Sequence, residues 1–191
     1  MIHQLVSNND PILKTKTEVF DFKNPPTDPI QLYYDLGETM IENNGIGLSA
    51  NQVGLPWRAF VLKAQDVIGV FNPRIVDAST ESIVLEEGCL SYPNLFVKVK
   101  RPVKIRVRYT LPNGETITRV FEGLTARAFQ HEMDHLDGTI YTTRANSYHL
   151  KQAKRHAEKL KKYPLLARSR LTVEAQQALD QLYLLNKDAV L

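Results

Sequence analysis

The feature that most constrains the fold is a block of short β-rich runs between Trp57 and Phe121, flanked on both sides by stretches of helical periodicity. The clearest run covers residues 103–109, where apolar residues alternate with lysine and arginine, so one face of this strand is expected to be apolar and the other solvated. The Asn113-Gly114 pair that follows is a strong hairpin-turn signal. The pattern therefore predicts a fold that contains both helices and strands.

Helices are expected toward both ends of the chain. Asp28 and Pro29 form a helix-start signal, and the Asn-Gly pair at residues 44–45 ends the helix that follows. Residues 148–187 predict two further helices separated near Pro164, the first very basic and the second amphipathic.

A third helical stretch carries two histidines. After Gly123 the period becomes helical again, and His131 and His135 fall on the face that the helix buries. Glu132 completes the pattern H-E-x-x-H, in which two histidines bind one divalent ion and the glutamate handles protons beside it. Gly138 ends this helix. The segment predicts a metal site inside the core, but two histidines alone do not complete such a site.

Composition is that of an ordinary globular protein of one domain. The chain has 191 residues, 43% of them hydrophobic and 24% charged, and its formal charge of +3 permits an anionic partner without demanding one. Cys89 is the single cysteine, so an intramolecular disulfide is excluded and a reducing cytosol is expected. The start of the sequence does not resemble a signal or transit peptide, and no apolar run approaches the ~20 residues of a membrane span.

Three positions could supply the missing ligand. A metzincin-type protease would carry a third histidine where this chain has Tyr141, so that class fails. A thermolysin-like protease needs a downstream glutamate, but Glu158 lies among cationic residues, where a solvated helix face is the better explanation. Cys89 is the remaining soft ligand. A lone cysteine is more often an inert buried residue, yet this one is the only thiol in a chain whose two-histidine helix lacks a partner.

Three separated motifs follow one another in the chain: GIGLSANQVG at residues 45–54, EGCLS at residues 87–91 and QHEMDHLDG at residues 130–138. In this order they resemble the G-x-G-L-A-A-x-Q motif, the cysteine motif and the histidine motif of the peptide deformylase family. The likeness extends from the NDPIL segment to about Tyr141, and the three motifs in order are far more specific than any one alone. The resemblance implies an α+β fold: antiparallel β-strands packed around a central helix that carries H-E-x-x-H, with an N-terminal helix and a C-terminal helical extension.

The resemblance also implies an activity and a domain layout. The activity is removal of the N-formyl group from the N-terminal formylmethionine of newly made polypeptides, with release of formate after metal-bound hydroxide attacks the formyl carbon. One divalent ion is implied, with Fe(II) as the native metal and Zn(II), Ni(II) or Co(II) as alternatives after isolation. Residues 1–148 would form the catalytic domain, and residues 149–191 would form basic and amphipathic helices packed on it or extending it.

The family's site residues carry over to this chain by motif. The metal ligands would be Cys89, His131 and His135. Glu132 would act as general base and acid, and the oxyanion would be stabilised by the Gln52 side-chain amide and the Leu90 backbone N–H. Without the resemblance, the local sequence predicts that Gln52 is a surface glutamine. The residues that would line the path of the peptide are Ile46, Gly47 and Gly88.

The sequence departs from the family's pattern near these residues. Ser49 replaces the alanine commonly found after G-x-G-L, a small change that is expected to be tolerated. Arg127 and Ala128 stand where many members carry apolar residues or a cysteine, which leaves the side-chain preference of the methionine pocket open. Gly45 and Gly47 would supply φ freedom at a helix C-terminus, room for a peptide backbone, or both.

The expected partners are N-formylmethionyl nascent peptides and, through the basic stretch from Lys151 to Lys162, the ribosome. No membrane or DNA partner is expected. The expected location is the cytoplasm of a bacterial or virus-infected bacterial cell, with an organelle lumen as the alternative. Two rivals stay open: a zinc endopeptidase or aminopeptidase, which would act on unformylated peptides, and a non-catalytic ribosome-associated protein, which need not retain Cys89, Gln52 and Glu132 together.

Overall fold

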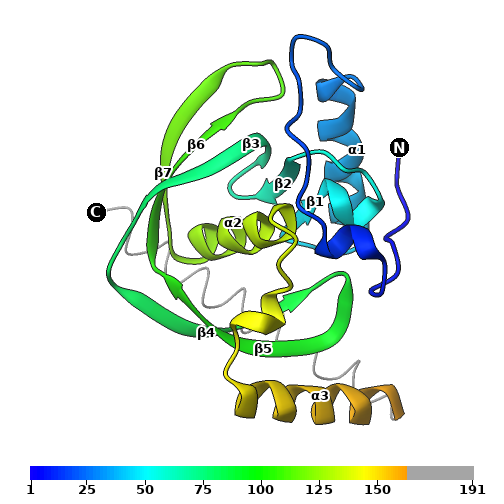
Figure 1. Cartoon of the computed structure of the whole chain (residues 1–191), viewed down its shortest axis with the longest axis vertical. Helices are drawn as coiled ribbons and strands as arrows, with labels where there is room; N and C mark the ends of the chain where they lie inside the picture. Colours follow the sequence, from blue (N-terminus) through cyan, green and yellow to red (C-terminus); the bar gives the residue numbers. More distant parts are fainter. Residues whose placement is uncertain (163–191) are drawn as a thin grey trace.

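The computed structural model describes residues 1–162 and has the α+β architecture that the sequence predicts (Figure 1). The helices of this part are α1 (Pro29–Glu42), α2 (Gly123–Leu136) and α3 (Ser147–Lys162). The strands are β1 (Gly47–Ser49), β2 (Ala59–Lys63), β3 (Val67–Ala78), β4 (Ser82–Cys89), β5 (Tyr92–Pro102), β6 (Lys104–Thr110) and β7 (Thr116–Glu122). Short 3₁₀ helices cover Pro11–Lys14, Ala50–Val53 and Tyr141–Arg144. The helix predicted after Pro164 lies outside the described residues.

All strand pairs in the two sheets are antiparallel. The larger sheet has the order β1-β2-β3-β6-β7, and the smaller sheet pairs β4 with β5. The predicted hairpin is the β6–β7 pair, whose register runs without a shift, and Gly114 turns the chain with a φ of 88°. On β6 the apolar side chains are buried and the lysine and arginines between them are exposed, which confirms the predicted two-faced strand.

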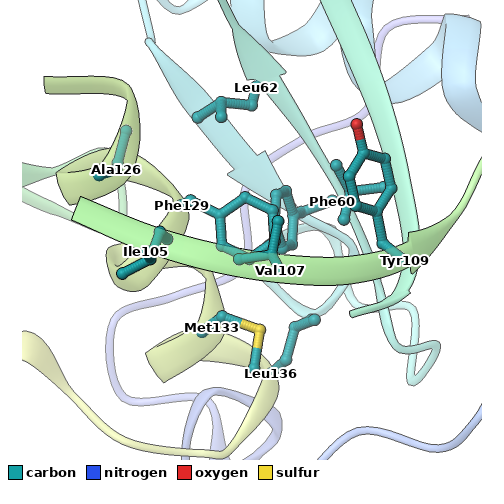
Figure 2. Packing of buried hydrophobic residues seen from close by; sticks show 11 residues of the cluster. Phe60, Leu62, Ile105, Val107, Tyr109, Ala126, Phe129, Met133 and Leu136 are labelled. Carbon is teal, nitrogen blue, oxygen red and sulfur yellow. The ribbon is translucent and has the colours of Figure 1, made fainter. Parts of the chain in front are cut away.

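Helix α2 lies between the two sheets, at the centre of the fold (Figure 1). Every residue from 126 to 136 is buried, which is unusual for a helix, and charged side chains such as Arg127 and Glu132 have their partners inside the protein. Its apolar side packs against β2 and β6 (Figure 2). Phe129 is central there, with its ring centroid 5.0 Å from Phe60 and 6.2 Å from Tyr109. This packing fixes the rotation of α2 and turns its histidines toward the smaller sheet.

The C-terminal carbonyl groups of α2 accept hydrogen bonds from other parts of the chain. Asn51 Nδ2 donates to the His135 carbonyl at 2.7 Å, and the Thr17 amide and hydroxyl both donate to the Leu136 carbonyl at 2.9 Å. Gly138 ends the helix with a φ of 67°, as its sequence position predicts, and a Cβ there would lie 2.7 Å from a carbonyl oxygen. A buried helix end without such partners would be unstable.

Helix α3 packs on β5, on the far side of the smaller sheet from α2 (Figure 1). Ala157 and Leu160 are its buried residues, whereas its cationic side chains are exposed. The very basic helix predicted in this region is thus present. No helix within residues 1–162 is long and apolar enough to span a membrane.

The segment after α1 differs from the sequence expectation in one respect. Neither Gly45 nor Gly47 has a positive φ, so conformational freedom is not what these positions require. They are instead places of close approach, because a Cβ on Gly45 would lie 2.8 Å from Leu90 Cδ1 and one on Gly47 would lie 2.5 Å from Glu132 Oε1. Strand β1, which contains Gly47, was also not predicted. At three residues it is too short to show an alternating pattern.

Candidate metal centre and active site

Two histidines of α2 and the cysteine that ends β4 converge at one point. The His131 and His135 ring centroids are 5.1 Å apart. Cys89 Sγ lies 3.1 Å from His135 Nε2, and the ligand atoms of all three residues lie within 4.8 Å of one another. Both histidines are buried and the cysteine is partly buried. The structure therefore brings together the three residues that the sequence predicts as metal ligands.

This donor set fits one divalent ion. Zinc, for example, binds thiolate sulfur at about 2.3 Å and imidazole nitrogen at about 2.0–2.1 Å, so its donors must gather about as closely as these do. His131 turns Nδ1 toward Glu87 Oε2, 3.2 Å away, which leaves Nε2 for a metal. Ligand histidines commonly have their second ring nitrogen held by a carboxylate in this way. Within residues 1–162 this is the only cluster with such spacing.

Glu87 belongs to a buried ion-pair network behind His131. Arg101 donates hydrogen bonds to both carboxylate oxygens of Glu87, at 2.6 and 2.8 Å, and Arg127 donates to Oε1 at 2.6 Å. Arg101 also pairs with Asp134 at 2.9 Å. All of these side chains are buried. The network joins α2 to the smaller sheet and fixes the ring that faces the metal site.

The network and the burial together set the protonation of the site. Burial alone would raise the pKa of Glu87, but hydrogen bonds from Arg101 and His131 lower it to about 2. Burial alone would lower the pKa of His131, but its bonds to Cys89 and Glu87 raise it to about 10. Burial and the nearby charge of His131 lower the pKa of His135 well below its usual value. Because a ligand imidazole must be neutral, a metal would have to displace a proton from His131 but not from His135.

Glu132, which follows His131 on α2, is 4% exposed. Its Oε2 accepts a hydrogen bond from the Ser49 hydroxyl at 2.7 Å, and Gly47 leaves room for Oε1. Burial raises the pKa of this carboxyl, and the charge of His131 and the Ser49 hydrogen bond oppose that rise. A buried carboxyl with a raised pKa is suited to accept and return a proton near neutral pH.

The predicted oxyanion donors lie beside Cys89. Gln52 is only 1% exposed, so it is not the surface glutamine that its local sequence suggests. Its Oε1 accepts a hydrogen bond from the Ser49 amide at 2.9 Å, which fixes the orientation of the side chain. Its Nε2 donates to Ser91 Oγ at 3.0 Å and lies 3.6 Å from Cys89 Sγ. Leu90 follows that cysteine in the turn between β4 and β5.

The three residues predicted to line the peptide path lie at strand edges. Strand β1 is an edge of the larger sheet, so Gly47 pairs with β2 on one side only. Ile46, which precedes this strand, is 59% exposed. Gly88 lies where the β4–β5 ladder shifts register. A free strand edge can pair with an extended peptide, so these positions suit that role.

The charge of Arg127 is paired with Glu87. The sequence alone left open how Arg127 affects the pocket for the substrate side chain. Besides Glu87, its guanidinium donates to the carbonyls of Val99 at 3.0 Å and Ile83 at 2.7 Å. Sequence reasoning missed this network entirely. The one local signal was the position of Glu87, two residues before Cys89 on the same strand.

Comparison with known proteins places this chain in a known family. The model of the family described as polypeptide deformylase matches residues 2–151. The chain belongs to this family. It is 42% identical to the peptide deformylase of Thermotoga neapolitana over 142 residues, which cover 74% of this chain and 78% of that protein.

Solved peptide deformylase structures have the same fold. One from Legionella pneumophila matches with a TM-score of 0.76 and 28% identity, over 88% of this chain and 99% of that one. Another, from Acinetobacter baumannii with Met-Ala-Ser bound, matches with a TM-score of 0.71 and 29% identity, over 75% of this chain and 98% of that one. Peptide deformylases are metalloenzymes that act on formylated nascent peptides. This chain is accordingly a hydrolase of N-terminal processing, the enzyme class that the sequence predicts.

Proposed function

We propose that this protein removes the formyl group from the N-terminal formylmethionine of new polypeptides and releases formate. The observation that carries the proposal is the convergence of Cys89, His131 and His135 within 4.8 Å, next to the buried carboxyl of Glu132. Three metal donors and one neighbouring acid-base group are the parts that metal-assisted amide hydrolysis needs.

Cys89, His131 and His135 would hold a single divalent ion, and Fe(II) is the native metal we propose, with Zn(II), Ni(II) or Co(II) as substitutes. When bound, such an ion polarises a carbonyl group and lowers the pKa of water. Raw affinity does not favour iron, which stands low in the Irving–Williams order, so metal supply or reactivity must select it. The hydrogen bond from His131 to Glu87 supports the assignment, because it holds this ring ready to bind through its other nitrogen.

Glu132 is the general base and acid of the proposed reaction. Its carboxylate takes a proton from the attacking water as the oxygen bonds to the formyl carbon. It then returns this proton to the departing amine nitrogen as the C–N bond breaks, so formic acid and a free amino group leave and the carboxylate is restored. The second proton of the water leaves on the formic acid, which ionises to formate in solution. Its burial supports this role, because burial raises the pKa of the carboxyl, which suits a group that accepts and returns a proton near neutral pH.

Gln52 and Leu90 are the proposed oxyanion donors. Negative charge develops on the formyl oxygen during the attack, and fixed N–H groups pointing at that oxygen lower the barrier. The amide of Gln52 is held at both ends, by the Ser49 amide and by Ser91 Oγ, so it needs little reorganisation when substrate binds. The backbone N–H of Leu90 would be the second donor.

The substrate would bind as an extended peptide along the free edge of β1. Gly47 lies on that strand and Ile46 precedes it, whereas Gly88 lies on β4 next to the proposed metal ligand Cys89. The relative from Acinetobacter baumannii has been solved with the tripeptide Met-Ala-Ser, which has the sequence expected of a deformylated product. We propose the same class of ligand for this chain.

Helix α3 is the proposed contact with the ribosome, which would place the protein in the cytoplasm of a bacterium or in an organelle. Its cationic residues are exposed: Lys151, Lys154, Arg155, Lys159, Lys161 and Lys162. Its apolar side packs on β5, so truncation would uncover the core and charge removal is the cleaner test. Lys154→Gln with Arg155→Gln should weaken salt-sensitive ribosome binding and leave turnover of short peptides unchanged. Unaltered ribosome binding would mean that these side chains are merely solvated.

The decisive assay for the reaction measures formate release from formyl-Met-Ala-Ser and cleavage of the same peptide without the formyl group. Rapid formate release, with no cleavage of the unformylated peptide, supports the proposal. Cleavage of the unformylated peptide would favour a zinc endopeptidase or aminopeptidase instead. Absence of both activities in metal-loaded protein would favour a non-catalytic role.

A further inference from the structure

Strand β1 contacts both carboxylate oxygens of Glu132. Ser49 and Gly47 are two residues apart on this strand, so they face the same side of it. The Ser49 hydroxyl donates to Oε2 at 2.7 Å, and a Cβ at Gly47 would lie 2.5 Å from Oε1. One residue therefore holds the first oxygen and the other leaves space for the second.

The Ser49 hydroxyl is the only hydrogen-bond donor to this carboxylate among the side chains and amides of residues 1–162. Ser49 is completely buried, and its amide is bonded to Gln52 Oε1 at 2.9 Å, so the serine is itself fixed. Two nearby cationic groups, those of His131 and Arg101, act on Glu132 through their charge. Charge alone does not set the direction of a carboxylate, whereas a short hydrogen bond does.

We propose that Ser49 is a positioning residue that orients the Glu132 carboxylate for proton transfer, an inference that rests on the acid-base role proposed above for Glu132. The hydroxyl donates to Oε2 and keeps its own proton throughout. Oε1 is left to take the proton from water and return it to the amine. A glutamate side chain has three rotatable bonds, so without this anchor the carboxylate spends less time within reach of the reacting atoms.

A purely structural explanation is available, because Ser49 Oγ also lies 3.4 Å from the Glu132 backbone carbonyl and could simply tie β1 to α2. Thr17 provides a matched control for that explanation. Its buried hydroxyl likewise bonds to a backbone carbonyl of α2, that of Leu136, at 2.9 Å, but it does not contact Glu132. Thr17→Val and Ser49→Ala thus each remove one buried hydroxyl that contacts the same helix.

The test compares full-length Ser49→Ala and Thr17→Val, both loaded with Ni(II), for metal content, unfolding temperature, kcat and KM on formyl-Met-Ala-Ser. Ser49→Ala should lower kcat by about tenfold, the effect expected from losing a hydrogen bond to a charged group. Its KM and metal content should match the wild type. Both variants should lower the unfolding temperature to a similar extent, but Thr17→Val should leave kcat unchanged. Equal kcat values for the two variants would overturn the proposal.

A double variant separates this inference from the proposed function. If Ser49 acts through Glu132, adding Ser49→Ala to Glu132→Gln should not lower the residual rate further, because the two changes remove one shared effect. A further tenfold loss in the double variant would show that Ser49 acts by another route. If Glu132→Gln alone kept the wild-type rate, the acid-base role of Glu132 would fail, whatever Ser49→Ala did.

Discussion

The Arg127 guanidinium donates a hydrogen bond to Glu87 Oε1 at 2.6 Å, and both side chains are buried between α2 and the smaller sheet. The residues are 40 positions apart in the sequence. Through Glu87 this contact reaches His131, so Arg127, whose effect on a side-chain pocket the sequence leaves open, supports a proposed metal ligand.

Replacement of Arg127 by leucine should destabilise the protein. Glu87 would keep Arg101 but lose one buried partner, and two backbone carbonyls would lose their donor. We expect the free energy of unfolding to fall by about 2–4 kcal/mol in urea titrations. Arg108→Leu, at an exposed position on β6, is the control and should change it by no more than about 0.5 kcal/mol. Equal stability of the two variants would contradict the structural role of Arg127.

The stability of the metal-free protein should depend on Glu87 in acid. Its pKa is lowered from 4.5 in the unfolded chain to about 2 in the folded protein, so its contribution is complete above pH 4.5 and is lost as the pH falls toward 2. Glu87→Gln should be less stable than the wild type at pH 7 and should lose this part of the acid dependence. Urea unfolding between pH 2 and pH 5 measures this dependence of the free energy of unfolding on pH. Glu86→Gln, at the exposed neighbouring residue, should keep the wild-type slope.

Metal binding should release a proton from His131. In the metal-free protein its pKa is raised to about 10, so the imidazole is protonated at pH 7 and must lose that proton to become a ligand. The apparent affinity for the metal should therefore fall by about tenfold for each unit by which the pH is lowered, for each proton displaced. Calorimetric titrations with Zn(II) in buffers of different ionisation enthalpy count the protons. A binding enthalpy that did not vary with the buffer would contradict this prediction.

Replacement of Glu132 by alanine should abolish most activity while the metal is retained. The carboxylate is not among the three clustered donors, so metal content should match that of the wild type. Loss of general acid-base help should reduce formate release by about 10²–10⁴-fold. Steady-state kinetics together with metal analysis measure both quantities. Near-normal formate release from a folded, metal-loaded variant would remove Glu132 from the mechanism.

Replacement of Cys89 by serine should weaken metal binding, because a neutral hydroxyl replaces a soft anionic ligand. Competition with a chelator measures the loss. In the wild type, the Fe(II) form prepared without oxygen should lose activity in air, because both the metal and the thiolate can be oxidised, whereas the Ni(II) form should last much longer. Full metal content and full rate in Cys89→Ser would show that Cys89 is not the third ligand.

The sequence by itself determined the elements whose signals are local. Asp28 caps α1 as predicted, with its side chain accepting from the amides of Ile30 and Gln31. The alternation along β6 placed its apolar face correctly, and helical spacing placed His131 and His135 on one buried side of α2. These features depend on neighbours within a few residues, so the sequence contains them directly.

Only the tertiary structure decided which distant groups meet. The sequence predicts Cys89 as the third ligand, but only the packing of β4 beside α2 brings its thiol to the two histidines. For Gly47 the sequence allows conformational freedom, room for a peptide backbone or both, whereas the structure places the Glu132 carboxylate against it. The contacts of Glu87 with Arg127 and of Ser49 with Glu132 span 40 and 83 positions. Such pairs depend on how the whole core packs, and a buried ion or hydroxyl is stable there only because that packing supplies its partner.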